Sequence, residues 1–153
     1  MSTEGIDPRY AGLDTWEARR IIEAVTEANA RAIAAVERAV PALTRAAEGV
    51  ESRLAAGGRL VYVGAGTSGR LCVQDAAELA PTFGFEDTVV LMAGGGEAQT
   101  KAKEGAEDDV EAAVADLERA GVGSADAVVG VAASGRTPYT VAAVKRAKAL
   151  GAF

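Results

Sequence analysis

Three short, mostly apolar runs stand out along the chain, at residues 60–63, 88–92 and 127–132. Each run has the length and the β-branched content of a buried strand. The stretches after them carry apolar residues at helical spacing, which predicts helices over about 68–79, 97–104, 109–120 and 138–150. Strands that alternate with helices indicate parallel βαβ units with right-handed crossovers. We therefore expect an α/β fold, a parallel three-layer αβα sheet of about three strands.

Ahead of the first strand, apolar residues recur at helical spacing over about residues 15–56. A capping pattern at 14–17 predicts where the first helix begins. Pro41 predicts a break near Ala39 and a second helix after it, and Pro81 predicts the end of the helix that follows the first strand. Residues 1–13 are expected to run as an extended arm. Two regions result, an N-terminal arm with helices over 1–56 and a partial sheet domain over 57–153, which form one continuous structural unit.

Composition then narrows the classes of function. The 153 residues can form one domain with its own core, and the net charge of −6 argues against a nucleic-acid surface. No apolar run has membrane-spanning length and no signal-peptide pattern is present, so a cytoplasmic protein is expected. The chain has no histidine and a single cysteine, Cys72, which excludes Ser–His and Cys–His nucleophile pairs and cysteine metal clusters. Acid–base chemistry would fall to carboxylates, Lys, Tyr or Cys.

A glycine-rich turn at residues 64–69 joins the first strand to the next helix. Such a turn presents free backbone N–H groups and the positive end of a helix to an anion. Ser-Gly-Arg occurs here, at 68–70, and again at 134–136, both times directly after a strand. We expect the two turns to hold one phosphate between them, with donors from Gly66, Thr67, Ser68, Gly69, Ser134, Gly135, Arg136 and Thr137. The alternatives are an ordinary tight turn at the first site and helix capping by Ser134 and Thr137 at the second.

Two carboxylates are candidates for acid–base chemistry. Glu78 has apolar neighbours and shares a helix face with Asp75, a setting that suits a general acid at neutral pH. Glu107 lies in the acidic segment 104–109, just before a predicted helix. The residues alone leave an alternative open for each site. Asp75 and Glu78 can be solvated acids on a helix surface. The acidic segment can cap the next helix, a role that suits Asp108 and Asp109 well.

The segments 64–71 (GAGTSGRL), 78–84 (ELAPTFG), 104–109 (EGAEDD) and 132–139 (AASGRTPY) resemble the N-acetylmuramic acid 6-phosphate etherases. These enzymes belong to the sugar isomerase (SIS) phosphosugar-binding domains. The resemblance implies a partial SIS domain over 57–153, with Glu78 and Glu107 as the catalytic residues. It implies a phosphorylated amino sugar as ligand, with no metal, no organic cofactor, no nucleic acid and no membrane. The chain departs from the family pattern at Cys72, Ala77, Leu79 and Ala80.

The implied reaction is that of a lyase in amino sugar metabolism and cell-wall recycling. The lactyl ether is cleaved by elimination and water addition, giving N-acetylglucosamine 6-phosphate and D-lactate. The resemblance suggests Glu107 as the base and Glu78 as the acid, although the sequence alone does not assign the roles. The main alternative is a non-catalytic phosphosugar-binding or regulatory module; an aldose–ketose phosphosugar isomerase fits the two glutamate motifs less well.

The resemblance and the short sheet together lead to an expectation about assembly. Family members continue with further strands and a helical region, so a truncated or split polypeptide is one interpretation and a natural short protein is the other. An unfinished parallel sheet leaves an open edge with unpaired backbone groups. A homodimer, or a complex with a chain that supplies the missing half, is therefore predicted.

Overall fold

The computed structural model describes residues 5–153, which fall into two compact units; one ends at Ala47 and the other runs from Glu48 to Phe153. In the first unit, two 3-10 turns, η1 (Pro8–Tyr10) and η2 (Leu13–Thr15), precede the long helix α1 (Ala18–Ala55), whose last turns, from Glu48 on, belong to the second unit. The predicted extended arm is therefore wrong where η1 lies, because a side-chain oxygen of Asp7 accepts a 3.0 Å bond from the N–H of Arg9 and fixes the turn. Residues 1–4 of that arm lie outside the described residues.

The predicted break at Pro41 is wrong, because α1 runs through it. Proline removes one intrahelical hydrogen bond, but alanines with high helix propensity flank it, at 39, 42, 46 and 47. The predicted capping pattern is also wrong. Thr15 belongs to η2, where its hydroxyl donates a 2.7 Å bond to the carbonyl of Gly12, and the first α-helical residue is Ala18.

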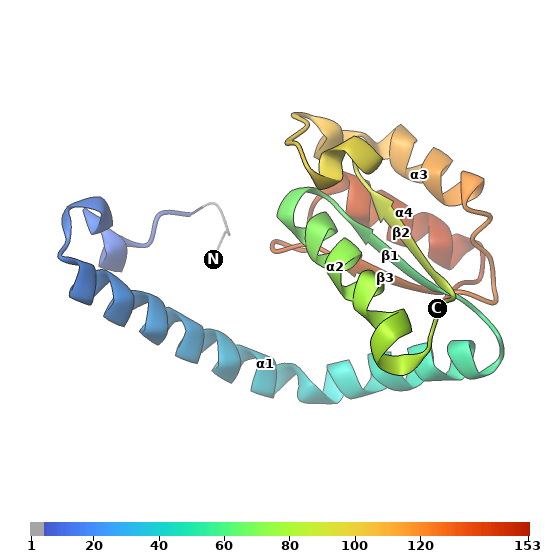
Figure 1. Cartoon of the computed structure of the whole chain (residues 1–153), viewed down its shortest axis with the longest axis horizontal. Coiled ribbons are helices and arrows are strands. Elements are labelled where there is room, and N and C mark those ends of the chain that lie inside the picture. Colours follow the sequence, from blue (N-terminus) through green and yellow to red (C-terminus); the bar gives the residue numbers. More distant parts are fainter. Residues whose placement is uncertain (1–4) are drawn as a thin grey trace. The chain divides into compact units, whose positions relative to one another are not determined.

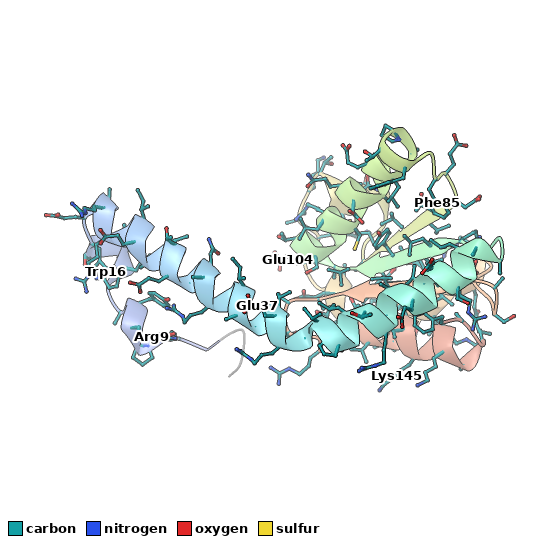
Figure 2. All side chains as sticks on the ribbon, turned by 90° about the horizontal axis from the view of Figure 1, so that it is seen from below. Arg9, Trp16, Glu37, Phe85, Glu104 and Lys145 are labelled. Carbon is teal, nitrogen blue, oxygen red and sulfur yellow. The ribbon has the colours of Figure 1, made fainter. Side chains whose placement is uncertain are left out.

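α1 carries an exposed apolar stripe in the first unit. Six large apolar side chains at helical spacing are half or more exposed: Ile22, Val25, Ile33, Val36, Val40 and Leu43. Figure 2 shows the side chains of this helix as sticks, with Glu37 labelled. No residue of α1 is buried. A stripe of this kind is typical of a helix that packs against another helix.

The second unit is built on a parallel sheet of three strands in the order β2-β1-β3. The strands are β1 (Leu60–Gly64), β2 (Thr88–Met92) and β3 (Ala127–Val131), as the apolar runs predict. Helix α2 (Gly66–Phe83) covers one face, while α3 (Val110–Arg119) and α4 (Pro138–Ala149) pack together on the other (Figure 1). The predicted α/β sheet of about three strands is confirmed.

Two segments of this unit differ from expectation. α2 runs past Pro81 to Phe83 and ends at Gly84, whose φ of 69° is the left-handed conformation typical of a helix C-terminus. The predicted helix over 97–104 is wrong. Short 3-10 turns replace it, η3 (Gly96–Gln99) and η4 (Ala106–Asp108), because the flanking Gly95 and Gly105 have positive φ values that interrupt a helix.

The core lies between the sheet and the pair α3 and α4. Val61 and Val63 of the central strand are fully buried there, together with Leu117 and Tyr139. The Tyr139 hydroxyl donates a 2.7 Å hydrogen bond to a carboxylate oxygen of Asp116, so the polar end of this buried ring has a partner. Among residues 5–153, no helix is both long and apolar enough to cross a membrane.

Candidate active site

The turn between β1 and α2 leaves backbone donors free. The residue before the helix, Ala65, offers no capping side chain, and the first intrahelical bond joins the Gly69 N–H to the Ala65 carbonyl at 3.1 Å. The N–H groups of Gly66, Thr67 and Ser68 therefore have no partner in the helix and are available to an anion. Close packing explains the last glycine, because a Cβ at position 69 would lie 3.0 Å from the Gly64 carbonyl oxygen.

The second Ser-Gly-Arg turn stands beside the first. Gly64 and Val131 are partners in the β1–β3 ladder, so the two turns begin on neighbouring strands about 4.8 Å apart. The Ser134 hydroxyl oxygen accepts a 3.1 Å bond from the Arg136 N–H, which leaves the hydroxyl proton for another acceptor. Thr137 precedes α4 but makes no capping bond with its side chain. Neither side chain therefore caps α4: Ser134 closes the turn before the helix, and Thr137 makes no capping bond.

A cavity of about 230 Å³ opens beside the first turn, on the side of β2. Gly66 and Thr67 line one wall, and the segment from Lys103 to Glu107 lines another; Glu104 of this segment is labelled in Figure 2. Arg70 also lines the cavity, and its guanidinium donates to the backbone carbonyls of Gln99 and Lys101 at 3.1 and 3.4 Å. Arg70 thus links the loop after β2 to α2, and it forms an ion pair with no acid among residues 5–153.

Glu78 lines a different cavity, of about 420 Å³, on the face of the sheet that α2 covers. Asp75, Tyr62 and Val131 line it as well, and the Tyr62 hydroxyl donates a hydrogen bond to the Asp75 carboxylate. Burial, followed by this bond, raises the pKa of Tyr62 above its ordinary value. The Glu78 side chain itself is exposed, so the apolar enclosure expected for it is absent. Burial also raises the pKa of the Cys72 thiol in the same wall.

The structure therefore brings only part of the predicted site together. Glu107 shares a cavity with Gly66 and Thr67, and the second Ser-Gly-Arg turn lies on the neighbouring strand. Glu78 lines none of that cavity. Of the acidic segment, Asp109 caps α3, because its carboxylate accepts a 2.8 Å bond from the Ala112 N–H, as the capping alternative predicts for it.

Two residues of these cavities were not predicted from sequence. Lys103 lines the wall that carries Glu107, and its amine donates to the Gly94 carbonyl at 3.4 Å. No periodic pattern marks it, because it lies in an irregular loop. Tyr62 is different: strand alternation places it on the opposite face from Val61 and Val63, a signal that was present in the sequence.

Comparison with known proteins identifies the family and the relatives of this chain. A family model described as the glucokinase regulatory protein N-terminal SIS domain matches residues 36–148. Proteins named N-acetylmuramic acid 6-phosphate etherase are 49% identical to this chain in Rubrobacter xylanophilus, 47% in Deinococcus radiodurans and 45% in Geobacillus thermodenitrificans. These alignments cover 99–100% of this chain but 50–52% of the relatives. The chain thus spans about half the length of the curated relatives that it matches.

Proposed function

This chain belongs to the SIS domain family, in the type found at the N-terminus of glucokinase regulatory protein, and from that premise we propose that it binds a phosphorylated amino sugar. The substrate we propose is N-acetylmuramic acid 6-phosphate, because the sequence relatives carry the name of the etherase. The reaction is cleavage of the lactyl ether to N-acetylglucosamine 6-phosphate and D-lactate. We place this activity in the cytoplasm, in the recycling of cell-wall amino sugars.

The observation that carries the proposal is the pair of turns at the carboxyl ends of β1 and β3. The free N–H groups of Gly66, Thr67 and Ser68 lie at the same edge of the sheet as the turn that carries Ser134 and Thr137. Most of these donors are neutral, so they can hold a phosphate without a tightly bound counter-charge. The proposed phosphate-binding residues also include Gly69, Gly135 and Arg136. Gly69 allows the close packing of the first turn, and Gly135 and Arg136 contribute the backbone of the second turn.

The proposed mechanism uses the open-chain aldehyde form of the sugar. Glu107 takes the proton from C2, next to the carbonyl carbon, and the electron pair forms the C2–C3 double bond. The C3–O bond to lactate breaks, and Glu78 gives its proton to the departing oxygen. Water then adds across the double bond, its hydroxyl to C3 and a proton to C2, which restores the hydroxyl of the amino sugar. The position of Glu107 beside Gly66 and Thr67 suits the base, since the sugar would extend from the bound phosphate into that cavity.

One observation favours a second candidate, a phosphosugar-binding module without catalysis. Within one copy, Glu78 and Glu107 line different cavities, so a single chain lacks the paired carboxylates that the reaction needs. The two candidates differ in what the purified chain does with N-acetylmuramic acid 6-phosphate. D-Lactate release supports the etherase, binding in calorimetry without release supports the module, and the absence of binding rejects both. N-Acetylmuramic acid without the phosphate is the control ligand, and we expect it to bind much more weakly.

We also propose that the chain forms a homodimer. The exposed apolar stripe on α1 supports this assembly, because six half-exposed large apolar side chains on one helix exceed what an isolated surface helix commonly carries. Complex formation with a chain that supplies further strands at the sheet edge is the alternative. Light scattering distinguishes a dimer of this chain from a monomer.

A further inference from the structure

The proposed substrate carries two anionic groups, and the two Ser-Gly-Arg turns account for one of them, the phosphate. The other is the carboxylate at the end of the lactyl group, which N-acetylglucosamine 6-phosphate lacks. A site that selects the ether substrate over this product therefore needs a second group that recognises a negative charge.

The covalent structure of the substrate places this carboxylate near the reacting carbon. In the open-chain sugar, four bonds join C2 to the carboxyl carbon, through C3, the ether oxygen and the lactyl carbon. Three bonds of an extended chain cover about 3.5 Å, so the carboxyl carbon lies within roughly 5 Å of C2. Because Glu107 is the proposed base at C2, the residue that holds the carboxylate must lie close to Glu107 in the same cavity.

Of the described residues, two with cationic side chains, Arg70 and Lys103, line the cavity that holds Glu107. Arg70 follows Gly66 by four residues on α2, so it lies about one turn from the proposed phosphate donors. Its Nε and Nη2 atoms already donate to two backbone carbonyls of the loop after β2. Lys103 lies instead on the wall that carries Glu107, four residues before it, and is thus the cation placed for the lactyl carboxylate.

The amine of Lys103 is held in position without a charged partner. Its aliphatic stem lies over Gly94, because a Cβ at Gly94 would be 2.9 Å from Cδ of Lys103. The amine donates to the Gly94 carbonyl at 3.4 Å, a long hydrogen bond that uses one of its three protons. Among residues 5–153, Lys103 forms an ion pair with no carboxylate. A positioned ammonium is therefore available to an anionic ligand in this cavity.

The acidic side chains near Lys103 make a cation necessary for this ligand. Glu104 and Glu107 line the same cavity, so an entering carboxylate would meet two like charges. Like charges a few ångströms apart repel each other, and an ammonium beside them offsets that repulsion. Lys103 can supply this positive charge from the wall that carries both glutamates.

We propose that Lys103 binds the lactyl carboxylate of the substrate and so determines the preference of the site for the ether substrate over N-acetylglucosamine 6-phosphate. The inference rests on the proposed etherase function and deepens it by naming the residue that recognises the second anion. Lys103 contacts the part of the substrate that leaves, while the phosphate stays at the two turns.

Calorimetry with the two phosphosugars tests this role of Lys103. The Lys103→Met variant removes the charge and keeps the stem as far as the δ atom, which packs on Gly94. Binding is measured in a Glu78→Gln background, which stops turnover and leaves this cavity intact, because Glu78 lines a different one. We expect Lys103→Met to weaken binding of N-acetylmuramic acid 6-phosphate about tenfold, a moderate loss because Lys103 is exposed, and to leave binding of N-acetylglucosamine 6-phosphate unchanged.

Two further variants and one modified ligand serve as controls. Lys101→Met changes an exposed lysine of the same loop that does not line the cavity, and it should bind both sugars as the background does. Lys103→Arg keeps the positive charge and should retain the preference for the ether substrate. The amide of N-acetylmuramic acid 6-phosphate removes the charge from the ligand instead, and it should bind equally well to the background and to Lys103→Met.

The outcomes separate failure of this inference from failure of the proposed function. If the background protein binds neither sugar, the proposed function itself is rejected. If it binds both sugars, and Lys103→Met weakens both equally or weakens neither, Lys103 does not recognise the carboxylate. That result would overturn the inference, while phosphosugar binding would stand.

Discussion

The guanidinium of Arg59 holds the carboxylate of Asp126 through two bonds, from Nη2 to Oδ2 at 2.9 Å and from Nε to Oδ1 at 3.0 Å. Asp126 is buried and also accepts a 2.9 Å bond from the Gly123 N–H. Arg59 directly precedes β1, and Asp126 directly precedes β3. This pair therefore fixes the start of the central strand to the start of its neighbour, at the opposite end of the sheet from the proposed site.

Replacing Asp126 by Asn should destabilise the fold by about 2–3 kcal/mol. This cost is smaller than for a fully buried ion pair, because Arg59 is one-third exposed and water screens part of the interaction. The Arg59 bonds hold the pKa of Asp126 below its ordinary value of 3.8. The Asp126 carboxylate thus binds a proton less readily in the folded state than in the unfolded chain. The stabilisation is present above pH 3.8 and is lost as the pH falls through the lower pKa that Asp126 has in the folded state. Urea unfolding at several acidic pH values measures the free energy of unfolding of the wild type and of the Asp126→Asn variant. If the difference between these two free energies did not become smaller as the pH is lowered, the prediction would be contradicted.

Replacing Gly69 by Ala should destabilise the fold by about 1–3 kcal/mol, because the new Cβ would lie 3.0 Å from the Gly64 carbonyl oxygen and from Met92. The strand and the helix must then move apart at the proposed phosphate site, so phosphosugar affinity should fall as well. Gly123→Ala is the matched control, since no heavy atom lies within 4 Å of a Cβ there. Thermal unfolding of both variants and calorimetry with the phosphosugar measure the effects. Equal stability of the two variants would refute the close contact.

Replacing Ser68 and Ser134 together by Ala should weaken phosphosugar binding by about tenfold to a hundredfold, since each lost hydrogen bond to a charged group costs about 1.5–3 kcal/mol but water replaces part of it. Both serines are half-buried, Ser68 in the first turn of α2 and Ser134 in the turn that precedes α4, and neither belongs to the core, so the fold should remain intact. Calorimetry measures the affinity, and circular dichroism checks the fold. Unchanged affinity in the double variant would exclude these hydroxyls from the site.

Glu78→Gln and Glu107→Gln should each abolish lactate release by an active form of this protein. Exchange of the sugar C2 proton in deuterated water separates the two roles. Exchange should continue in the variant that lacks the acid and stop in the variant that lacks the base, because only the base touches that proton. Mass spectrometry of the recovered sugar measures the exchange. Full lactate release by both variants would refute the two-carboxylate mechanism.

Replacing Ile33 by Glu should weaken the dimer, because it places a charge in the middle of the exposed apolar stripe of α1. Arg38 is exposed and lies on the opposite face of the same helix, five residues on, so Arg38→Glu is the control and should leave the dimer unchanged. Light scattering at micromolar concentration reads the mass of each variant. A wild-type chain that is a stable monomer under these conditions would reject the assembly itself.

Much of the second unit could be predicted from sequence. The three strands followed from their apolar runs, because burial on both faces of a parallel sheet requires near-continuous apolar residues. The helix break predicted at Pro41 and the helix end predicted at Pro81 are wrong, because the helix-favouring residues around each proline outweigh the loss of one hydrogen bond. The loops after β2 were misjudged because positive φ values at glycine, which break a helix, are set by packing and have no periodic signal.

The site was predicted in its parts, while the distances between the parts were not. The two Ser-Gly-Arg turns followed from topology, because the ends of parallel strands share one edge. The separation of Glu78 from the first turn could have been read from the sequence, as twelve helical residues already fix an axial distance. The position of Lys103 beside Glu107 could not be predicted from the sequence, because it depends on how an irregular loop folds back over Gly94.

The order β2-β1-β3 also has a consequence for how the chain folds. Leu60 of the central strand pairs with Ala127, which lies 67 residues later in the chain. The pairing of the central strand with β2 closes a shorter loop, since Leu60 pairs there with Thr88. No two neighbouring strands are joined by a tight hairpin, and long loops must close before their contacts repay the entropy. During synthesis, one edge of β1 stays open until residue 131 has emerged from the ribosome. The interval between completion of β2 and arrival of β3 is therefore the period in which a nascent chain is most exposed to wrong strand pairing.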